Sequence, residues 1–157
     1  MAAFYRILCR AEAVIAGAFL LAMVVLIFTG GVARMLAMPL NWTTDIATCL
    51  FAWACFLCAD IAWRNNGLMA IELVTARLPA AASAMLARVN LLLIAAFLVY
   101  AIIAGAELAW VSRARTFQGI PGVSYSWVTA SMPAGAALLL ITTLLKLRDT
   151  FRAPRAA

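Results

Sequence analysis

Four long runs of apolar residues, each free or nearly free of charged side chains, dominate the sequence. They cover residues 13–33, 46–63, 89–110 and 123–145. The first run is 21 residues long. As an α-helix it would be about 31 Å long, which matches the ~30 Å hydrocarbon core of a bilayer. It is too long for a signal-peptide core, so we expect it to remain as a membrane anchor. The pattern predicts an all-α integral membrane protein, with residues 1–157 forming a single four-helix transmembrane domain.

The segment between the second and third runs has a helical pattern of its own. Apolar residues recur at helical spacing from Leu68 to Leu78, and Pro79 follows them. A short amphipathic stretch of this kind is typical of a helix that lies on the membrane surface. We therefore expect four transmembrane helices, with a short cytoplasmic interfacial helix between the second and the third.

Composition supports the membrane assignment and limits the chemistry. Hydrophobic residues make up 68% of the chain and charged residues 11%, whereas a soluble domain carries about a quarter charged residues. The net charge is +6, but the cations are scattered singly between apolar runs, which favours membrane lipids and excludes a nucleic-acid surface. The chain has no histidine, which removes His-based catalysis and His-ligated metals. We expect no enzyme activity, no cofactor and no metal site.

The distribution of cations predicts the orientation. Nine of the twelve lie in segments that share one side of a four-span protein, namely Arg6, Arg10, Arg64, Arg77, Arg88, Lys146, Arg148, Arg152 and Arg155. The opposite side holds Arg34, Arg113 and Arg115. By the positive-inside rule, both termini face the cytoplasm. Trp42, Trp110 and Trp127 then fall near the outer interface, and Trp63 near the inner one.

Acidic residues near the membrane are the candidates for chemistry. Asp60 precedes Arg64 by four residues, so the two can pair on one helix face, and an ion or proton role is the alternative. We expect Glu12 to be interfacial and solvated, and Glu107 to pair with Arg113 or Arg115. Asp45 precedes the second run and is expected to cap its helix.

Other residues in the spans indicate packing. Gly17 and Gly105 belong to patterns of small residues that let helices approach closely, either within the chain or against a second protein. Trp53 lies at mid-span and is expected to contact protein. Pro133 predicts a kink in the last span. Cys49, Cys55 and Cys58 lie within an apolar run, which favours packing over a thiol oxidoreductase, since exchange needs a thiolate.

Several short motifs together resemble a known family. Trp42 and Asp45 open the second run, which continues with an aromatic-rich stretch at residues 51–57. The later matches are Arg64, Gly67, Glu72, Leu78, Pro79, Gly119, Ile120, Pro121, Tyr125, Trp127, Met132 and Pro133. This sequence resembles the small membrane subunit of tripartite ATP-independent periplasmic (TRAP) transporters, the DctQ-like family. Leu68 and Cys58 depart from it, standing where histidine and glycine are common.

The resemblance implies a small permease subunit in the bacterial inner membrane. It would scaffold a large TRAP membrane subunit and help a periplasmic substrate-binding protein to dock during sodium-coupled uptake of an organic anion, such as a carboxylate or sialic acid. We expect a membrane partner interface at Gly17, Trp53 and Gly105. The expected periplasmic rim comprises Asn41, Trp42, Asp45, Arg113, Arg115, Gly119 and Pro121. The alternative is a four-span drug/proton exporter acting as a homodimer, with Glu12 as the nearest candidate carboxylate.

Overall fold

The computed structural model describes residues 2–65 and 79–152 of the chain. Its elements are α1 (Ala2–Met35), α2 (Asn41–Arg64), α4 (Ala80–Val111), the 3-10 turn η1 (Ser112–Ala114), α5 (Ser126–Thr129) and α6 (Ser131–Arg152). Four stretches are long and apolar enough to cross a membrane: Cys9–Met35, Asn41–Arg64, Met85–Ala114 and Ser126–Thr150. The prediction of an all-α protein with four membrane-spanning helices is confirmed. The predicted interfacial helix falls mainly on residues 66–78, which lie outside the described residues.

The helix boundaries differ from the predicted spans. A charge-free run ends at the first charged residue, whereas a helix can continue through such a residue. The second run was placed at 46–63, but α2 begins at Asn41 and continues through Asp45. The fourth span was predicted at 123–145, whereas its helices begin at Ser126, after the preceding loop, and continue to Arg152. Polar residues at the ends of a spanning helix reach water without interrupting its hydrogen bonds, so the helix extends beyond its apolar centre.

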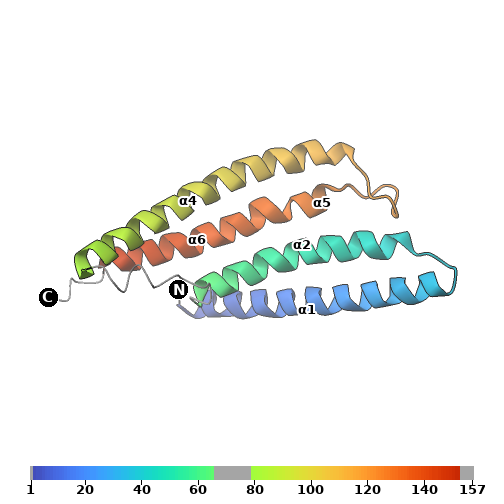
Figure 1. The fold of residues 1–157 in the computed structure, drawn as a ribbon, viewed down its shortest axis with the longest axis horizontal. Helices are drawn as coiled ribbons and strands as arrows, with labels where there is room; N and C mark the ends of the chain where they lie inside the picture. The colour runs from blue at the N-terminus through green and yellow to red at the C-terminus, as the bar shows by residue number, and fades with distance from the viewer. Residues whose placement is uncertain (1, 66–78, 153–157) are drawn as a thin grey trace.

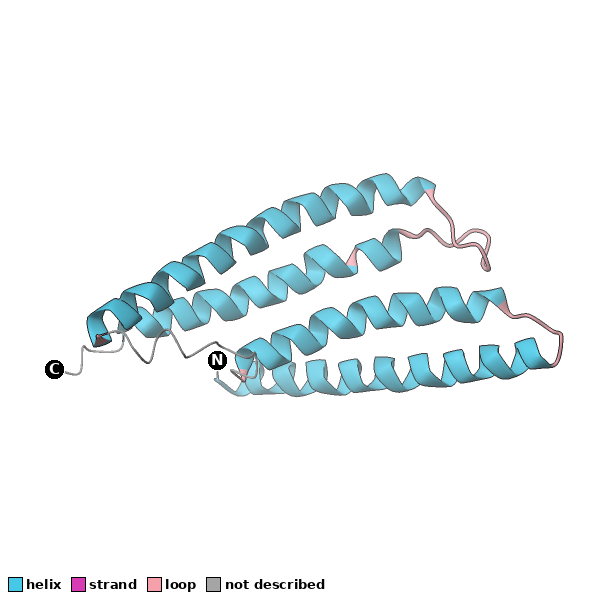
Figure 2. Ribbon diagram, in the orientation of Figure 1, coloured by secondary structure: helices cyan, strands magenta, loops and turns pink. Residues whose placement is uncertain are grey.

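The four long helices lie side by side in a row whose order differs from the order of the chain. Figure 1 shows α4, α6, α2 and α1 in succession, and α1 packs on α2, α2 on α6, and α6 on α4. The row has one end where α2 finishes at Arg64, here called the Arg64 end, and an opposite end, here called the Gly119 end. Short loops join the helices at the Gly119 end (Figure 2).

Burial follows this order. A core cluster of Leu98, Ala101 and Ala136 joins α4 to α6. Gly135 lies so close to the Phe56 side chain of α2 that an added Cβ would overlap it, which lets α6 approach α2 closely. Only 6% of the residues in the α1 span window are buried, against 33% in the last span. The edge helices α1 and α4 therefore expose most of their apolar side chains to whatever surrounds the row.

The predicted kink in the last span appears as a break between two helices. α5 ends at Thr129 and α6 begins at Ser131. Pro133 has no N–H to donate to the carbonyl of Thr129, so the regular series of helix hydrogen bonds is interrupted at this point. The Trp53 indole Nε1 of α2 donates to the Trp127 carbonyl just before the break, at 3.0 Å. Trp53 of α2 therefore contacts α5 of its own chain.

Candidate functional site

A cluster of buried and half-buried polar side chains, three of them ionisable, joins three helices at the Arg64 end. Arg64 of α2 donates to Glu12 Oε2 of α1 at 2.6 Å, and it also donates to Asp60 Oδ2 on its own helix. Asp60 Oδ1 accepts a hydrogen bond from Thr142 Oγ1 of α6 at 2.7 Å. We call Glu12, Asp60, Arg64 and Thr142 the Arg64 cluster. The predicted pairing of Asp60 with Arg64 is confirmed.

The prediction that Glu12 is interfacial and solvated is wrong, because its side chain is buried. Its side chain is 6% exposed, and that of Asp60 is 0% exposed. Helix α1 lies on α2 at this point, so Glu12 turns inward to the guanidinium of Arg64 instead of outward to water. Glu12 Oε1 is buried with no hydrogen-bond partner among the described residues. Removing the cation from such a cluster would leave buried carboxylates uncompensated, which costs about 3–5 kcal/mol.

A second polar contact lies next to this cluster. The Trp63 indole Nε1 donates to Thr143 Oγ1 of α6 at 3.0 Å. Lys146 Nζ lies 4.3 Å from the centre of the Trp63 ring and donates to the Trp63 carbonyl. Sequence reasoning missed Thr142 and Thr143, although two adjacent hydroxyl residues in an otherwise apolar run were a visible signal. These contacts fix α6 against α2.

At the Gly119 end, Asp45 has a role different from the predicted helix cap. The N-cap position of α2 is Leu40, with no side-chain hydrogen bond. Asp45 Oδ2 instead accepts the N–H of Gly119 at 2.7 Å, across 74 residues of sequence. Gly119 lies against the backbone of Asn41 and Trp42, so that an added Cβ would overlap those atoms. Two distant segments of the predicted rim are therefore in direct contact.

The loop that carries Gly119 is held in a defined shape by its own hydrogen bonds. Phe117 N–H donates to the Val123 carbonyl at 3.0 Å, and Tyr125 N–H donates to the Arg115 carbonyl at 2.8 Å. The Phe117 ring is buried and packs edge-on against the Tyr125 ring, with 5.6 Å between the ring centres. Gly122 makes the turn with a φ of +99°, a conformation that side-chain-bearing residues rarely adopt.

The arginines of the predicted rim are exposed beside this loop. Arg115 borders a cavity of about 330 Å³ together with Asp45 and Tyr125. Arg113 borders a second cavity, of about 360 Å³, and its guanidinium lies 4.1 Å from the centre of the Trp110 ring. Pro121 is also exposed. Asn41, Trp42, Asp45, Arg113, Arg115, Gly119 and Pro121 thus gather at the Gly119 end, and we call them the rim.

Glu107 does not make its predicted ion pair. Its side chain is exposed, and among the described residues it has no ion pair with Arg113 or Arg115. Arg113 lies over Trp110 instead. Glu107 and Arg113 are six residues apart, which places them on different sides of a helix, and Arg113 already belongs to the turn η1.

The two glycines predicted for a membrane interface have different environments. Gly17 of α1 is exposed, and an added Cβ there would meet nothing within 4 Å. Gly105 of α4 is buried, and an added Cβ would lie 2.9 Å from Pro133 Cδ of α6. Gly105 therefore serves packing inside the chain, which corrects its assignment to a partner interface. Gly17 remains available to a partner.

Comparison with known proteins gives one finding that accounts for this arrangement. A family model described as "Tripartite ATP-independent periplasmic transporters, DctQ component" matches residues 23–153. The match includes α2, α4, α5 and α6 and the last part of α1, from residue 23 onward. No protein among the curated sequences matches the chain.

Proposed function

The chain belongs to the DctQ family of tripartite ATP-independent periplasmic (TRAP) transporter components, and from this membership we propose that it is the small permease subunit of a sodium-coupled transporter for an organic anion. The family consists of transporter components and not of enzymes. With its four spanning helices, the chain is a multi-pass protein of the inner membrane. The family match is the observation that carries the proposal.

The chain acts as a scaffold and holds neither substrate nor coupling ion. The carboxylate of Asp60 supports this proposal, because one of its oxygens accepts from Arg64 and the other from Thr142. A sodium ion at Asp60 would have to displace one of these partners. The hydrogen bonds of the Arg64 cluster join α1, α2 and α6 into a stiff row of helices. A large, moving transport subunit can be anchored against this row.

The large membrane subunit contacts the scaffold at membrane depth, and Gly17 on the exposed face of α1 is one position of close approach. The rim docks the periplasmic substrate-binding protein. In this orientation both termini are cytoplasmic, and the positive-inside distribution of the cations supports it. The carried anion is a carboxylate or a sialic acid.

Reconstitution of the purified three-component system tests the proposal. The chain is co-expressed with its large subunit and placed in liposomes with an inward sodium gradient, and uptake is measured on adding the loaded binding protein. We expect uptake that needs all three proteins and the gradient. Asp60→Asn and Glu107→Gln in an assembled complex should leave the sodium dependence of uptake unchanged, and loss of sodium coupling in either would show an ion site in this chain.

The alternative of a homodimeric drug/proton exporter loses its candidate residue. An exporter needs a carboxylate that exchanges protons with a cationic substrate. Glu12 is buried and bound to Arg64 instead. The same reconstitution separates the two functions, since an exporter would transport without any partner.

A further inference from the structure

One stripe of α4 carries polar groups on a surface that is otherwise apolar and uncovered. Its members recur at helical spacing and are all exposed: Leu93, Ala96, Phe97, Tyr100, Ile103 and Glu107. We call this set the Tyr100 stripe. Tyr100 is 67% exposed, and no side-chain hydrogen bond of Tyr100 or Glu107 occurs within the described part of the chain. The stripe lies on an edge helix of the row, opposite α1 (Figure 1).

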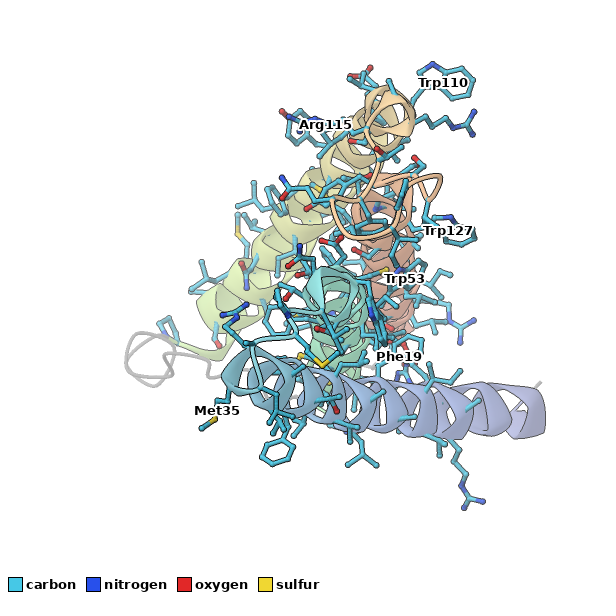
Figure 3. The ribbon with its side chains drawn as sticks, turned by 90° about the vertical axis from the view of Figure 1, so that its right-hand side faces the viewer. Phe19, Met35, Trp53, Trp110, Arg115 and Trp127 are labelled. Carbon is cyan, nitrogen blue, oxygen red and sulfur yellow. The ribbon has the colours of Figure 1, made fainter. Side chains whose placement is uncertain are left out.

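Tyr100 lies at the middle of the stretch of α4 that is long and apolar enough to cross a membrane. It is the central position of the span Met85–Ala114. Ten residues, or about 15 Å of helix, separate it from Trp110, and 15 Å is half the hydrocarbon thickness. Trp110 is 68% exposed and projects away from the helices at the Gly119 end, as expected for a residue of the interfacial aromatic belt (Figure 3).

Lipid tails offer no hydrogen-bond partner to the polar groups of the Tyr100 stripe. Tyrosines that face lipid gather at the interface, where the hydroxyl reaches water or headgroups. A phenol side chain is about 6 Å long and cannot span the ~15 Å from the midplane to the interface. In hydrocarbon its hydroxyl would have no acceptor, which costs free energy that a polar protein neighbour would restore. The exposed carboxylate of Glu107, one turn inside Trp110, adds a charge to the same stripe.

The α1 edge gives a contrast within the same molecule. Its exposed side chains include Leu21, Val24 and Phe28. The hydroxyl of Thr29 donates to the Val25 carbonyl of its own helix at 2.7 Å. The hydroxyl of Thr29 is already satisfied within α1 and needs no acceptor from a neighbour, whereas the hydroxyl of Tyr100 needs an acceptor from another molecule.

We propose that the Tyr100 stripe is a protein–protein contact inside the membrane, covered by a transmembrane helix of the large subunit that offers a hydrogen-bond acceptor at the midplane and a lysine or arginine level with Glu107. This inference rests on the proposed function for the identity of the partner. A second copy of the chain would cover the Tyr100 stripe less well than the large subunit. If α4 packed in parallel against α4 of another copy, two-fold symmetry would bring two Glu107 carboxylates together, and they would repel each other.

A binding titration tests the polar contacts. Fluorescently labelled large subunit is titrated with the purified chain in detergent micelles, and dissociation constants are compared between variants. Tyr100→Phe removes only the hydroxyl and should weaken binding about threefold to tenfold, the range of interhelical hydrogen bonds in membranes. Glu107→Lys should weaken it further by repelling the partner's cation. Thr29→Val is the matched control, since it removes a hydroxyl from α1 and should leave binding unchanged. Unchanged binding in Tyr100→Phe and Glu107→Lys would overturn the proposal.

Photocrosslinking identifies the neighbour directly. A benzophenone-bearing phenylalanine is placed at position 100, or at the exposed position 141 of α6 as the control, in cells that express the complete transporter. A crosslink from position 100 to the large subunit supports the proposal. Crosslinks to lipid alone or to a second copy overturn it, while co-purification of the large subunit with the wild-type chain would still support the proposed function. Failure of the large subunit to bind the wild-type chain would instead overturn the proposed function.

Discussion

Arg64 of α2 donates to Glu12 of α1 at 2.6 Å, although 52 residues separate the two in the sequence. Apolar helices in a bilayer gain no hydrophobic energy by leaving lipid for one another, so their relative position depends on close packing and on polar contacts. Helix α1 is an edge helix with few buried residues. The pair of Glu12 and Arg64 therefore fixes the position of α1 along α2.

Replacing Arg64 tests this role. Arg64→Gln leaves the carboxylates of Glu12 and Asp60 buried without their cation, and the expected loss of stability is about 3–5 kcal/mol. Thermal unfolding of the purified chain in detergent should show a clearly lowered midpoint. Arg148→Gln is the control, because Arg148 meets Asp149 at 3.8 Å on an exposed surface, where such pairs contribute little. Equal midpoints in the two variants would contradict a structural role for the Arg64 cluster.

The two glycines of the predicted membrane interface should behave differently when enlarged. Gly105→Leu forces α4 away from Pro133 of α6, and the overpacking should cost about 1–3 kcal/mol in the isolated chain. Gly17→Leu meets nothing in the chain and should change its stability by less than about 0.5 kcal/mol, while lowering the yield of complex with the large subunit. Unfolding midpoints and co-purification yields, measured on the same preparations, separate the two effects. Full assembly of Gly17→Leu would exclude Gly17 from the interface.

The contact between Asp45 and Gly119 should control the shape of the rim. Gly119→Ala places a Cβ against the backbone of Asn41 and Trp42, so the loop has to move away from α2. We expect faster proteolysis of this loop and weaker docking of the substrate-binding protein, with the membrane complex intact. Asp45→Asn keeps an oxygen that can accept the Gly119 N–H and should be mild, whereas Asp45→Leu should resemble Gly119→Ala. A mild phenotype for Asp45→Leu would show that the contact is dispensable.

Charge reversal at the rim tests the docking surface. The double variant Arg113→Glu with Arg115→Glu should slow association of the substrate-binding protein at low salt, because charges at the edge of an interface act mainly on the association rate. Arg34→Glu is the control, since Arg34 is exposed at the same end of the row but lies outside the rim. Surface-immobilised complex in nanodiscs allows the rates to be measured at several salt concentrations. Equal slowing by Arg34→Glu would indicate a general field effect instead of docking at the rim.

Cysteine labelling tests the orientation. All four native cysteines are changed to serine, and one exposed position is then changed to cysteine, either Gln118→Cys at the Gly119 end or Asn65→Cys at the Arg64 end. In intact cells with a permeable outer membrane, an impermeant maleimide should label position 118 and not position 65. Labelling of position 65 alone would reverse the orientation. Transport by the cysteine-free chain confirms that the tested molecule is functional.

Features that depend on nearby residues were determined by the sequence itself. The four spans follow from runs of apolar residues long enough to cross hydrocarbon, because an isolated helix satisfies its own backbone in lipid. Asp60 and Arg64 pair because four residues bring side chains together on any α-helix. Pro133 interrupts the last span because its ring removes one hydrogen bond of the helix. None of these outcomes needs another part of the chain.

Only the tertiary structure decided which residues meet across the chain. The row order α4, α6, α2, α1 turns Glu12 inward, brings Asp45 to Gly119 and buries Gly105 against Pro133. In a soluble helix, an apolar stripe marks the side that faces protein. A membrane helix is apolar all around, because lipid and protein neighbours are equally apolar, so its sequence carries little information about which side packs against protein. The inward-facing sides become visible only when the helices are packed.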